Sequence, residues 1–213
     1  MLDQNVHNFD LFKQNNDELS AQEEKQITAL QLLSFRKHNF LPSNIQSTPI
    51  REWLKNFMSI GQALVVVSPD ATVKLIVDLI LAQMSIILLG NKTQKIIAEN
   101  AWKSMKPAAF MLTEIAHGSD TKNMKTTATY DETTQEFILH TPDFLAAKCW
   151  SGNLDLSCTI AVVFAQMYIK EVCYGLHAFL VPIRHPETHQ LYPGLTIKDV
   201  GIKIGLNGVD NGY

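Results

Sequence analysis

Apolar residues recur at helical spacing through the first half of the chain. In the stretch 17–38 they stand three or four positions apart, as at Ile27, Leu30 and Leu33. This spacing places them on one face of an amphipathic helix. Three more stretches of this kind follow, and Ser68-Pro69, a capping residue before a proline, begins the longest. The pattern predicts four helices: 17–38, one from Thr48-Pro49 through Met58, 69–89 and 93–105.

After Pro107 the pattern changes to short runs of β-branched and aromatic residues separated by polar turns. The clearest hairpin joins 125–130 to 135–140 across a short polar turn. The other runs that predict strands are 161–165, 176–183 and 195–197. We therefore predict an α+β chain. A helical domain at 1–106, with a poorly ordered polar arm at 1–16, precedes an antiparallel β-barrel or sandwich at 107–213.

Composition excludes several classes of function. The 213 residues are 46% apolar with a net charge of −3, which suits a globular core and gives no basic footprint for nucleic acid or an anionic membrane surface. Three cysteines without metal-ligand spacing fit free thiols in a reducing compartment. The apolar stretch 75–89 contains Asp78, so a buried helix is expected rather than a membrane span. We expect no metal site, no secretory signal and, from the last residues, no Ser-Lys-Leu peroxisomal address.

One stretch stands out as a candidate site. The apolar run Phe110 to Leu112 stops at Thr113-Glu114, and a small polar turn follows through Asp120. An ordinary strand-to-turn junction is the simpler interpretation of these residues alone. A binding loop held by a rigid strand is the alternative.

The stretch resembles a known signature. Thr113-Glu-Ile-Ala-His-Gly-Ser-Asp120 is similar to the Thr-Glu-x-x-x-Gly-Ser words of acyl-CoA dehydrogenases and oxidases. Further words resemble the peroxisomal acyl-CoA oxidases: 126–131, 136–142, 174–184 and Asn207-Gly-Val-Asp-Asn-Gly212. The resemblance is dense from about residue 79 onward and sparse before residue 68.

The resemblance implies a fold and a reaction. The family has helices, a β-domain and a further helical bundle that forms a dimer, and the bundle has no counterpart in this sequence. It implies FAD-dependent α,β-desaturation of a fatty acyl-CoA to a trans-2-enoyl-CoA. Molecular oxygen then reoxidises the flavin and yields hydrogen peroxide, in peroxisomal β-oxidation. The family's catalytic glutamate lies in the bundle, so no catalytic residue is assigned and the isolated chain is expected to show no turnover on palmitoyl-CoA.

The same resemblance implies the binding residues. Thr113 matches the family threonine at the flavin. Lys148-Cys-Trp-Ser-Gly152 resembles a second flavin-facing word, which makes Trp150, Ser151 and Gly152 cofactor candidates. Ser119 matches a residue at the acyl-CoA entrance. A buried tryptophan, a turn glycine and a turn-stabilising serine are the structural alternatives.

Departures from the family pattern leave other functions open. Asp155 and Leu156 stand where the oxidases usually have glycine and lysine, and Asp155 would be strained if its φ were positive. A catalytically inactive binding module is one alternative function. An acyl-CoA dehydrogenase-like flavoprotein is another.

Overall fold

The computed structural model describes residues 12, 19–37 and 48–213, so the predicted arm at 1–16 lies outside the described residues except for Phe12. The helices are α1 (Ala21–Lys37), α2 (Ile50–Val67), α3 (Pro69–Ile76), α4 (Met84–Leu89) and α5 (Lys92–Lys103). A π-helical segment, η2 (Val77–Gln83), joins α3 to α4. The predicted helix at 69–89 is therefore present, with a local change of hydrogen bonding in its middle.

Capping residues fix the starts of α3 and α5, whereas α2 begins after Pro49 without the side-chain cap expected from Thr48. The Ser68 side chain accepts a hydrogen bond from Ala71 N, with Pro69 in the first turn of α3. Asn91 begins α5 through a capping box, in which its side chain accepts from Gln94 N and the Gln94 side chain accepts from Asn91 N. Each cap satisfies backbone donors that a helix start leaves open.

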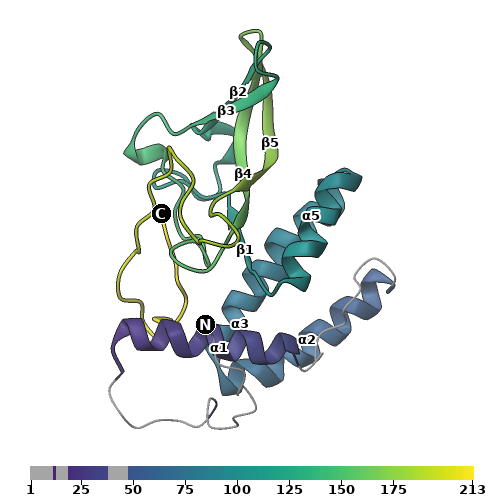
Figure 1. The fold of residues 1–213 in the computed structure, drawn as a ribbon, viewed down its shortest axis with the longest axis vertical. Helices are drawn as coiled ribbons and strands as arrows, with labels where there is room; N and C mark the ends of the chain where they lie inside the picture. The colour runs from purple at the N-terminus through teal and green to yellow at the C-terminus, as the bar shows by residue number, and fades with distance from the viewer. Residues whose placement is uncertain (1–11, 13–18, 38–47) are drawn as a thin grey trace.

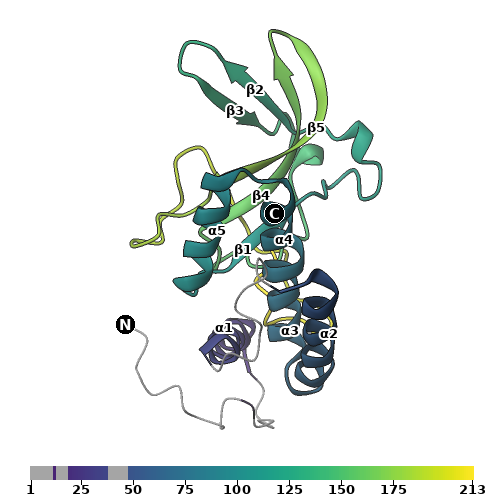
Figure 2. The same ribbon diagram turned by 90° about the vertical axis from the view of Figure 1, so that its right-hand side faces the viewer.

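The continuous helical stretch Pro69–Leu89 is long and apolar enough to cross a membrane by length and composition alone. In the fold it is a core element instead. Asp78, in its middle, is completely buried, forms an ion pair with Arg36 and accepts a hydrogen bond from Ala108 N. Figure 2 shows α3 and α4 rising in a column toward the sheet. The expectation of a buried helix therefore holds for the middle of the stretch, whereas Leu88 and Leu89 at its end are 71% and 67% exposed.

The strands are β1 (Ala108–Met111), β2 (Thr127–Asp131), β3 (Glu136–His140), β4 (Ile160–Ile169) and β5 (Val172–Pro182). Strand β4 is central. One of its edges carries β1 and then β2, both parallel to it, and the other edge carries β5 antiparallel. β3 extends β2 as the predicted antiparallel hairpin, with Thr127 opposite His140. Figure 1 shows the resulting sheet above the helices.

The prediction of a wholly antiparallel barrel or sandwich is correct only in part. The described strands form one curled mixed sheet, since the β1–β4 and β2–β4 pairs are parallel. Alternation of apolar residues identifies a strand but does not give its partner or direction. The expected strand at 195–197 is wrong: this stretch is irregular, although Leu195 and Ile197 pack against the core.

Three apolar clusters hold the molecule together. One lies among the helices around Trp53 and Leu75, and one lies beneath the sheet around Leu154 and Ile183. The third joins helix to strand and contains Ala82, Ile86, Ala98, Ala108 and Val162. Since this third cluster draws residues from both sides of position 106, helices and sheet share part of their core. The boundary itself stays a prediction.

Candidate functional site

Two backbone segments far apart in sequence meet at the end of β1. Glu114 and Lys148 form an antiparallel bridge, and Cys149 N donates to Thr113 O at 3.0 Å. Thr113 and Trp150, named as cofactor candidates from separate words, therefore lie on adjoining segments. Thr113 is half-buried, and Trp150 is 68% exposed with a positive φ of 59°. The fold therefore bonds the backbones of these two segments to each other and leaves the indole of Trp150 open to solvent.

Ser151 and Gly152, the other two cofactor candidates, face the interior. Ser151 is 1% exposed, and its hydroxyl donates to Phe110 O at 3.2 Å. A Cβ built on Gly152 would lie 3.0 Å from Val77 Cγ2 of η2. Both residues therefore have packing roles in the described structure, and their contact with a ligand stays a prediction.

The loop after Thr113 closes on itself. Glu114 N donates to His117 O at 3.0 Å and His117 N donates to Glu114 O at 3.1 Å, which makes a tight turn. Ser119, the substrate-entrance candidate, is exposed beyond this turn, and its carbonyl accepts from Thr121 N at 2.9 Å. Its proposed ligand role rests on the resemblance alone.

A buried ion pair supports the two segments from below. The carboxylate of Glu114, 1% exposed, accepts from Thr126 N at 2.8 Å and Thr126 Oγ1 at 2.6 Å and from Lys125 N at 2.9 Å. Lys148 Nζ lies 3.3 Å from Glu114 Oε1. Burial raises the pKa of Glu114, but these hydrogen bonds and the lysine charge outweigh it, so the net shift is downward. The carboxylate is therefore held ionised as a structural anion.

Asp210 has a role that the sequence interpretation left open. It is 1% exposed and forms a direct ion pair with Lys74 of α3. Its second carboxylate oxygen accepts from Ser157 Oγ at 2.6 Å, Ser157 N at 2.7 Å and Leu156 N at 3.1 Å. Burial lowers the pKa of Lys74 to about 7. A spacing of more than 130 positions between Lys74 and Asp210 gives no signal that a single sequence could show.

The expected strain at Asp155 is absent. Its φ is not positive; in this segment the left-handed residues other than glycine are Trp150 and Asn153, at φ 59° and 68°. Asp155 instead accepts a hydrogen bond from Lys25 Nζ of α1 at 3.0 Å. Asp155, which departs from the family pattern, therefore anchors helix α1, and its backbone carries no strain from a positive φ.

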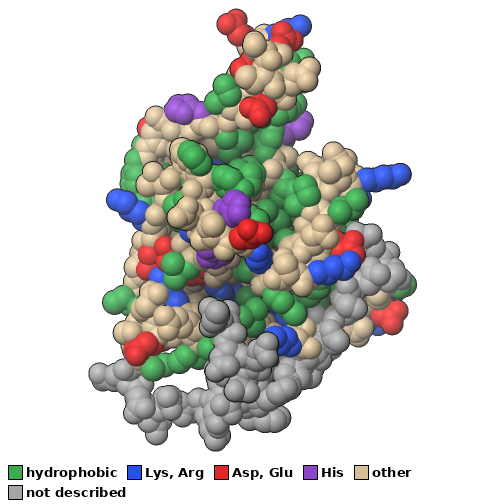
Figure 3. Space-filling view, viewed as in Figure 1, with side chains coloured by type: hydrophobic (Ala, Val, Ile, Leu, Met, Phe, Trp, Pro, Cys, Tyr) green, Lys and Arg blue, Asp and Glu red, His purple; other side chains and the backbone are tan. Residues whose placement is uncertain are grey.

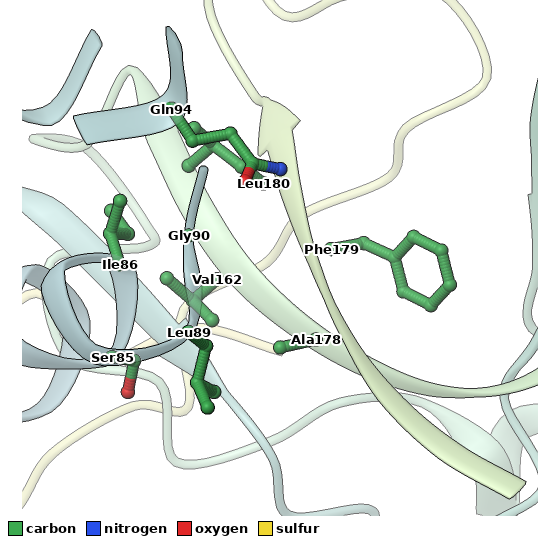
Figure 4. A pocket seen from close by; sticks show the side chains of 9 residues that line it. All are labelled: Ser85, Ile86, Leu89, Gly90, Gln94, Val162, Ala178, Phe179 and Leu180. Atoms are coloured by element: carbon green, nitrogen blue, oxygen red, sulfur yellow. The ribbon is translucent and has the colours of Figure 1, made fainter. Parts of the chain in front are cut away.

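A small pocket opens between the end of α4, the start of α5 and strands β4 and β5 (Figure 4). Its lining includes Leu89, Val162, Phe179 and Leu180. The predicted site residues do not line it. Among residues 12, 19–37 and 48–213, no group of three or more His, Cys, Asp or Glu side chains could hold a metal ion.

Comparison with known families matches the β-rich half of the chain. Residues 109–213 match the model of the acyl-CoA dehydrogenase middle domain. Human peroxisomal acyl-coenzyme A oxidase 3 is 52% identical over 105 residues, which are 49% of this chain and 15% of that protein. Human peroxisomal acyl-coenzyme A oxidase 1 is 50% identical over 101 residues, 47% of this chain and 15% of that protein.

Solved structures extend the likeness to the helices. Acyl-CoA oxidase 1 of Yarrowia lipolytica has a TM-score of 0.80 at 28% identity, over 91% of this chain and 27% of that one. Acyl-CoA oxidase-1 of Caenorhabditis elegans, solved with FAD and ATP, has a TM-score of 0.74 at 31% identity, over 91% and 28%. The chain thus spans well under half the length of the relatives it matches. Residues 109–213 thus match the acyl-CoA dehydrogenase middle domain, and the chain is similar to the N-terminal and middle-domain portion of the peroxisomal acyl-CoA oxidases.

Proposed function

We propose that this chain supplies the FAD- and acyl-CoA-facing part of an acyl-CoA oxidase, which converts fatty acyl-CoA to trans-2-enoyl-CoA with production of hydrogen peroxide. The observation that carries the proposal is the meeting of Thr113 and Trp150 on adjoining segments, joined by the hydrogen bond from Cys149 N to Thr113 O at 3.0 Å. Both residues were chosen from family motifs, and the bond between their segments supports the choice.

The residues at this surface fit a flavin ring. An indole that is 68% exposed offers a broad aromatic face, and the half-buried Thr113 offers a hydroxyl that can bond a ring edge without adding charge. Ser151 and Gly152 then act indirectly on flavin binding, because their interior contacts hold the segment that carries Trp150. When bound, FAD supplies the hydride acceptor for the reaction.

No residue of this chain is assigned as the catalytic base. Three fully buried carboxylates in the described structure, Asp78, Glu114 and Asp210, each contact a lysine or arginine. Each is a fixed counter-ion and is not poised to take the α-proton of a thioester. We therefore expect no sustained peroxide production from the isolated chain with palmitoyl-CoA.

The family resemblance also supports proposals on cellular location, oligomeric state, electron acceptor and domain organisation. We infer a peroxisomal protein, a homodimer in its full-length form and molecular oxygen as electron acceptor, since the matched relatives carry the names of peroxisomal acyl-coenzyme A oxidases. A helical domain at 1–106, a β middle domain at 107–213 and closure of the mixed sheet into a barrel belong to the same proposal. A dehydrogenase that passes electrons to another protein is the alternative within the superfamily.

A non-catalytic binding module is the second candidate. Strand β3 favours it, because among the described strands it pairs only with β2 and it exposes Phe137, Ile138 and Leu139 by 40%, 57% and 36%. Such an apolar edge strand can pair with another chain. A chain that binds neither FAD nor acyl-CoA but captures a partner through β3 would support this second candidate.

The test is flavin binding by the purified chain. We expect FAD titration to shift the flavin absorption bands and Trp150→Ala to weaken binding. Tyr174→Ala is the matched control, since Tyr174 is an aromatic residue of β5 that is 56% exposed. Absence of FAD binding in a folded wild-type sample contradicts the proposal. An equal loss of FAD affinity in Trp150→Ala and Tyr174→Ala would contradict a specific role of Trp150 in binding.

A further inference from the structure

We propose that Asp210 is a positioning residue for the candidate flavin surface: through Lys74 and Ser157 it holds the segment 150–157 in the conformation that presents Trp150. The inference rests on the proposed function for its ligand and on the geometry for its mechanism. It assigns Asp210 no contact with substrate or cofactor.

Asp210 binds the far end of the segment through both main chain and side chain. One carboxylate oxygen accepts three hydrogen bonds from Leu156 and Ser157, at 2.6 to 3.1 Å. The backbone carbonyl of Asp210 accepts from Asp155 N at 3.2 Å. A buried carboxylate with this many donors fixes the turn 155–157, because removal of one partner leaves the others unsatisfied.

The near end of the segment is tied to the same C-terminal stretch. Ser151 N donates to Gly212 O at 3.3 Å and Gly212 N donates to Ser151 O at 3.0 Å, directly beside Trp150. A Cβ built on Gly212 would lie 3.1 Å from Asp155 N and 3.2 Å from Leu154 Cβ, so a side chain at this position would press on the turn. Asp210 and Gly212 therefore bind the two ends of the segment 150–157.

Lys74 connects these contacts of Asp210 to helix α3. Its Nζ contacts Asp210 directly and donates to Ser157 Oγ at 3.0 Å, while Asn153 Nδ2 donates to the Lys74 carbonyl at 3.2 Å. Asn153 has a positive φ of 68°, and Trp150 one of 59°. Non-glycine residues hold this conformation only where their surroundings fix it. The network of Asp210, Lys74 and Ser157 supplies that fixation, and Trp150 projects outward from it.

Because of this connection, the proposed site requires α3 to stay packed against the C-terminal stretch that carries Asp210. Lys74 belongs to α3, and Asp210 belongs to the irregular C-terminal stretch, which Figure 1 shows in yellow, running from the sheet down to α1. If α3 shifts, the carboxylate loses its buried counter-ion and the turn loses its anchor. The exposed indole then samples other orientations, although Asp210 never touches it.

The experiment substitutes two serines, Ser157 and Ser68, in the full 213-residue chain. Ser157→Ala removes the hydroxyl shared by Lys74 and Asp210. Ser68→Ala is the matched control, because Ser68 is a buried hydroxyl at the start of the same helix α3, bonded to Gln31 and Ala71. Ser157→Thr restores a hydroxyl. Asp210→Asn is the stronger variant, used where it folds by circular dichroism.

Two readouts separate positioning from stability. The first is iodide quenching of tryptophan fluorescence without FAD. Trp53 is fully buried and Trp102 is half-buried, so Trp150→Phe identifies the component that belongs to Trp150. We expect Ser157→Ala to change the quenching of Trp150, Ser68→Ala to leave it unchanged and Ser157→Thr to restore it. The second is FAD affinity, which should fall about tenfold or more in Ser157→Ala and Asp210→Asn and stay near wild type in Ser68→Ala.

The outcomes distinguish this inference from the proposed function. Unchanged Trp150 quenching in folded Ser157→Ala overturns the positioning role, whatever FAD does. Equal changes in Ser68→Ala and Ser157→Ala overturn it too, because the effect would then be general loosening of α3. If Ser157→Ala alone changes the quenching of Trp150 and the wild-type chain binds no FAD, the positioning role is supported and the flavin proposal is contradicted.

Discussion

Arg36 and Asp78 form a buried ion pair that ties three parts of the fold together. The guanidinium belongs to α1 and lies 4.3 Å above the ring of Trp102 in α5. The carboxylate belongs to η2, is fully buried and also accepts from Ala108 N of β1 at 2.8 Å. One aspartate therefore fixes the place where the helices meet the sheet.

Removing this carboxylate should be strongly destabilising. Asp78→Asn leaves Arg36 buried without its counter-ion, which costs about 3 to 5 kcal/mol of unfolding free energy for a broken buried pair. Glu99→Gln is the control: its pair with Lys103 is exposed, and such pairs contribute about 0.2 to 1 kcal/mol. Urea unfolding measures both. A loss under 1 kcal/mol in Asp78→Asn would show that the pair does not hold the fold.

Acid should unfold the chain partly through Glu114. Its pKa in the folded protein is lowered, so its stabilising effect is present above the unfolded value near 4.5 and is lost as the pH falls through the folded value. We expect Glu114→Gln to be less stable than wild type at pH 7 and to lose less stability on acidification. The measurement is urea unfolding at pH 7, 5 and 3.

Glu132→Gln is the control for the acid series, since its pair with Lys170 at the tip of the sheet is exposed on both sides. Figure 3 shows charged side chains of both signs at this tip. Parallel pH curves for wild type and Glu114→Gln would contradict the assignment of Glu114 as a structural anion.

Local sequence rules predicted the elements of this fold better than their partners. Ser68-Pro69 starts a helix where expected, because a cap acts within four residues, whereas Asn91, which also caps a helix start, was not predicted to do so. The parallel pairing of β1 and β2 with β4 depends on contacts 39 to 52 positions apart, which alternation cannot reveal. Thr113 and Trp150 were chosen as candidates from family motifs. Nothing in the sequence indicated the Lys74–Asp210 pair, which the structure shows.

The glycine at position 152 should be needed for packing. A Cβ there would lie 3.0 Å from Val77 Cγ2, closer than such atoms normally come, so Gly152→Ala should cost about 1 to 3 kcal/mol. Gly118→Ala is the control, because nothing lies within 4 Å of its Cβ position.

Relief of the contact provides a second test. Val77→Ala removes the methyl group that the new Cβ would meet, so the double variant should lose less stability than the sum of the single losses. Additive losses, measured by urea unfolding, would show that Val77 is not what excludes a side chain at position 152.

The three cysteines should differ sharply in reactivity. Burial raises the pKa of Cys158 to about 12, and the residue is fully buried beneath the sheet, whereas Cys173 of β5 is exposed. The thiolate is the reactive form, so Cys158 should resist iodoacetamide at pH 8 in the native protein and react after unfolding. Cys149 is half-buried with a raised pKa and should react at an intermediate rate. Mass spectrometry of the alkylated peptides measures the order, and rapid native labelling of Cys158 would show that the core around Leu154 and Ile183 opens far more often than its packing implies.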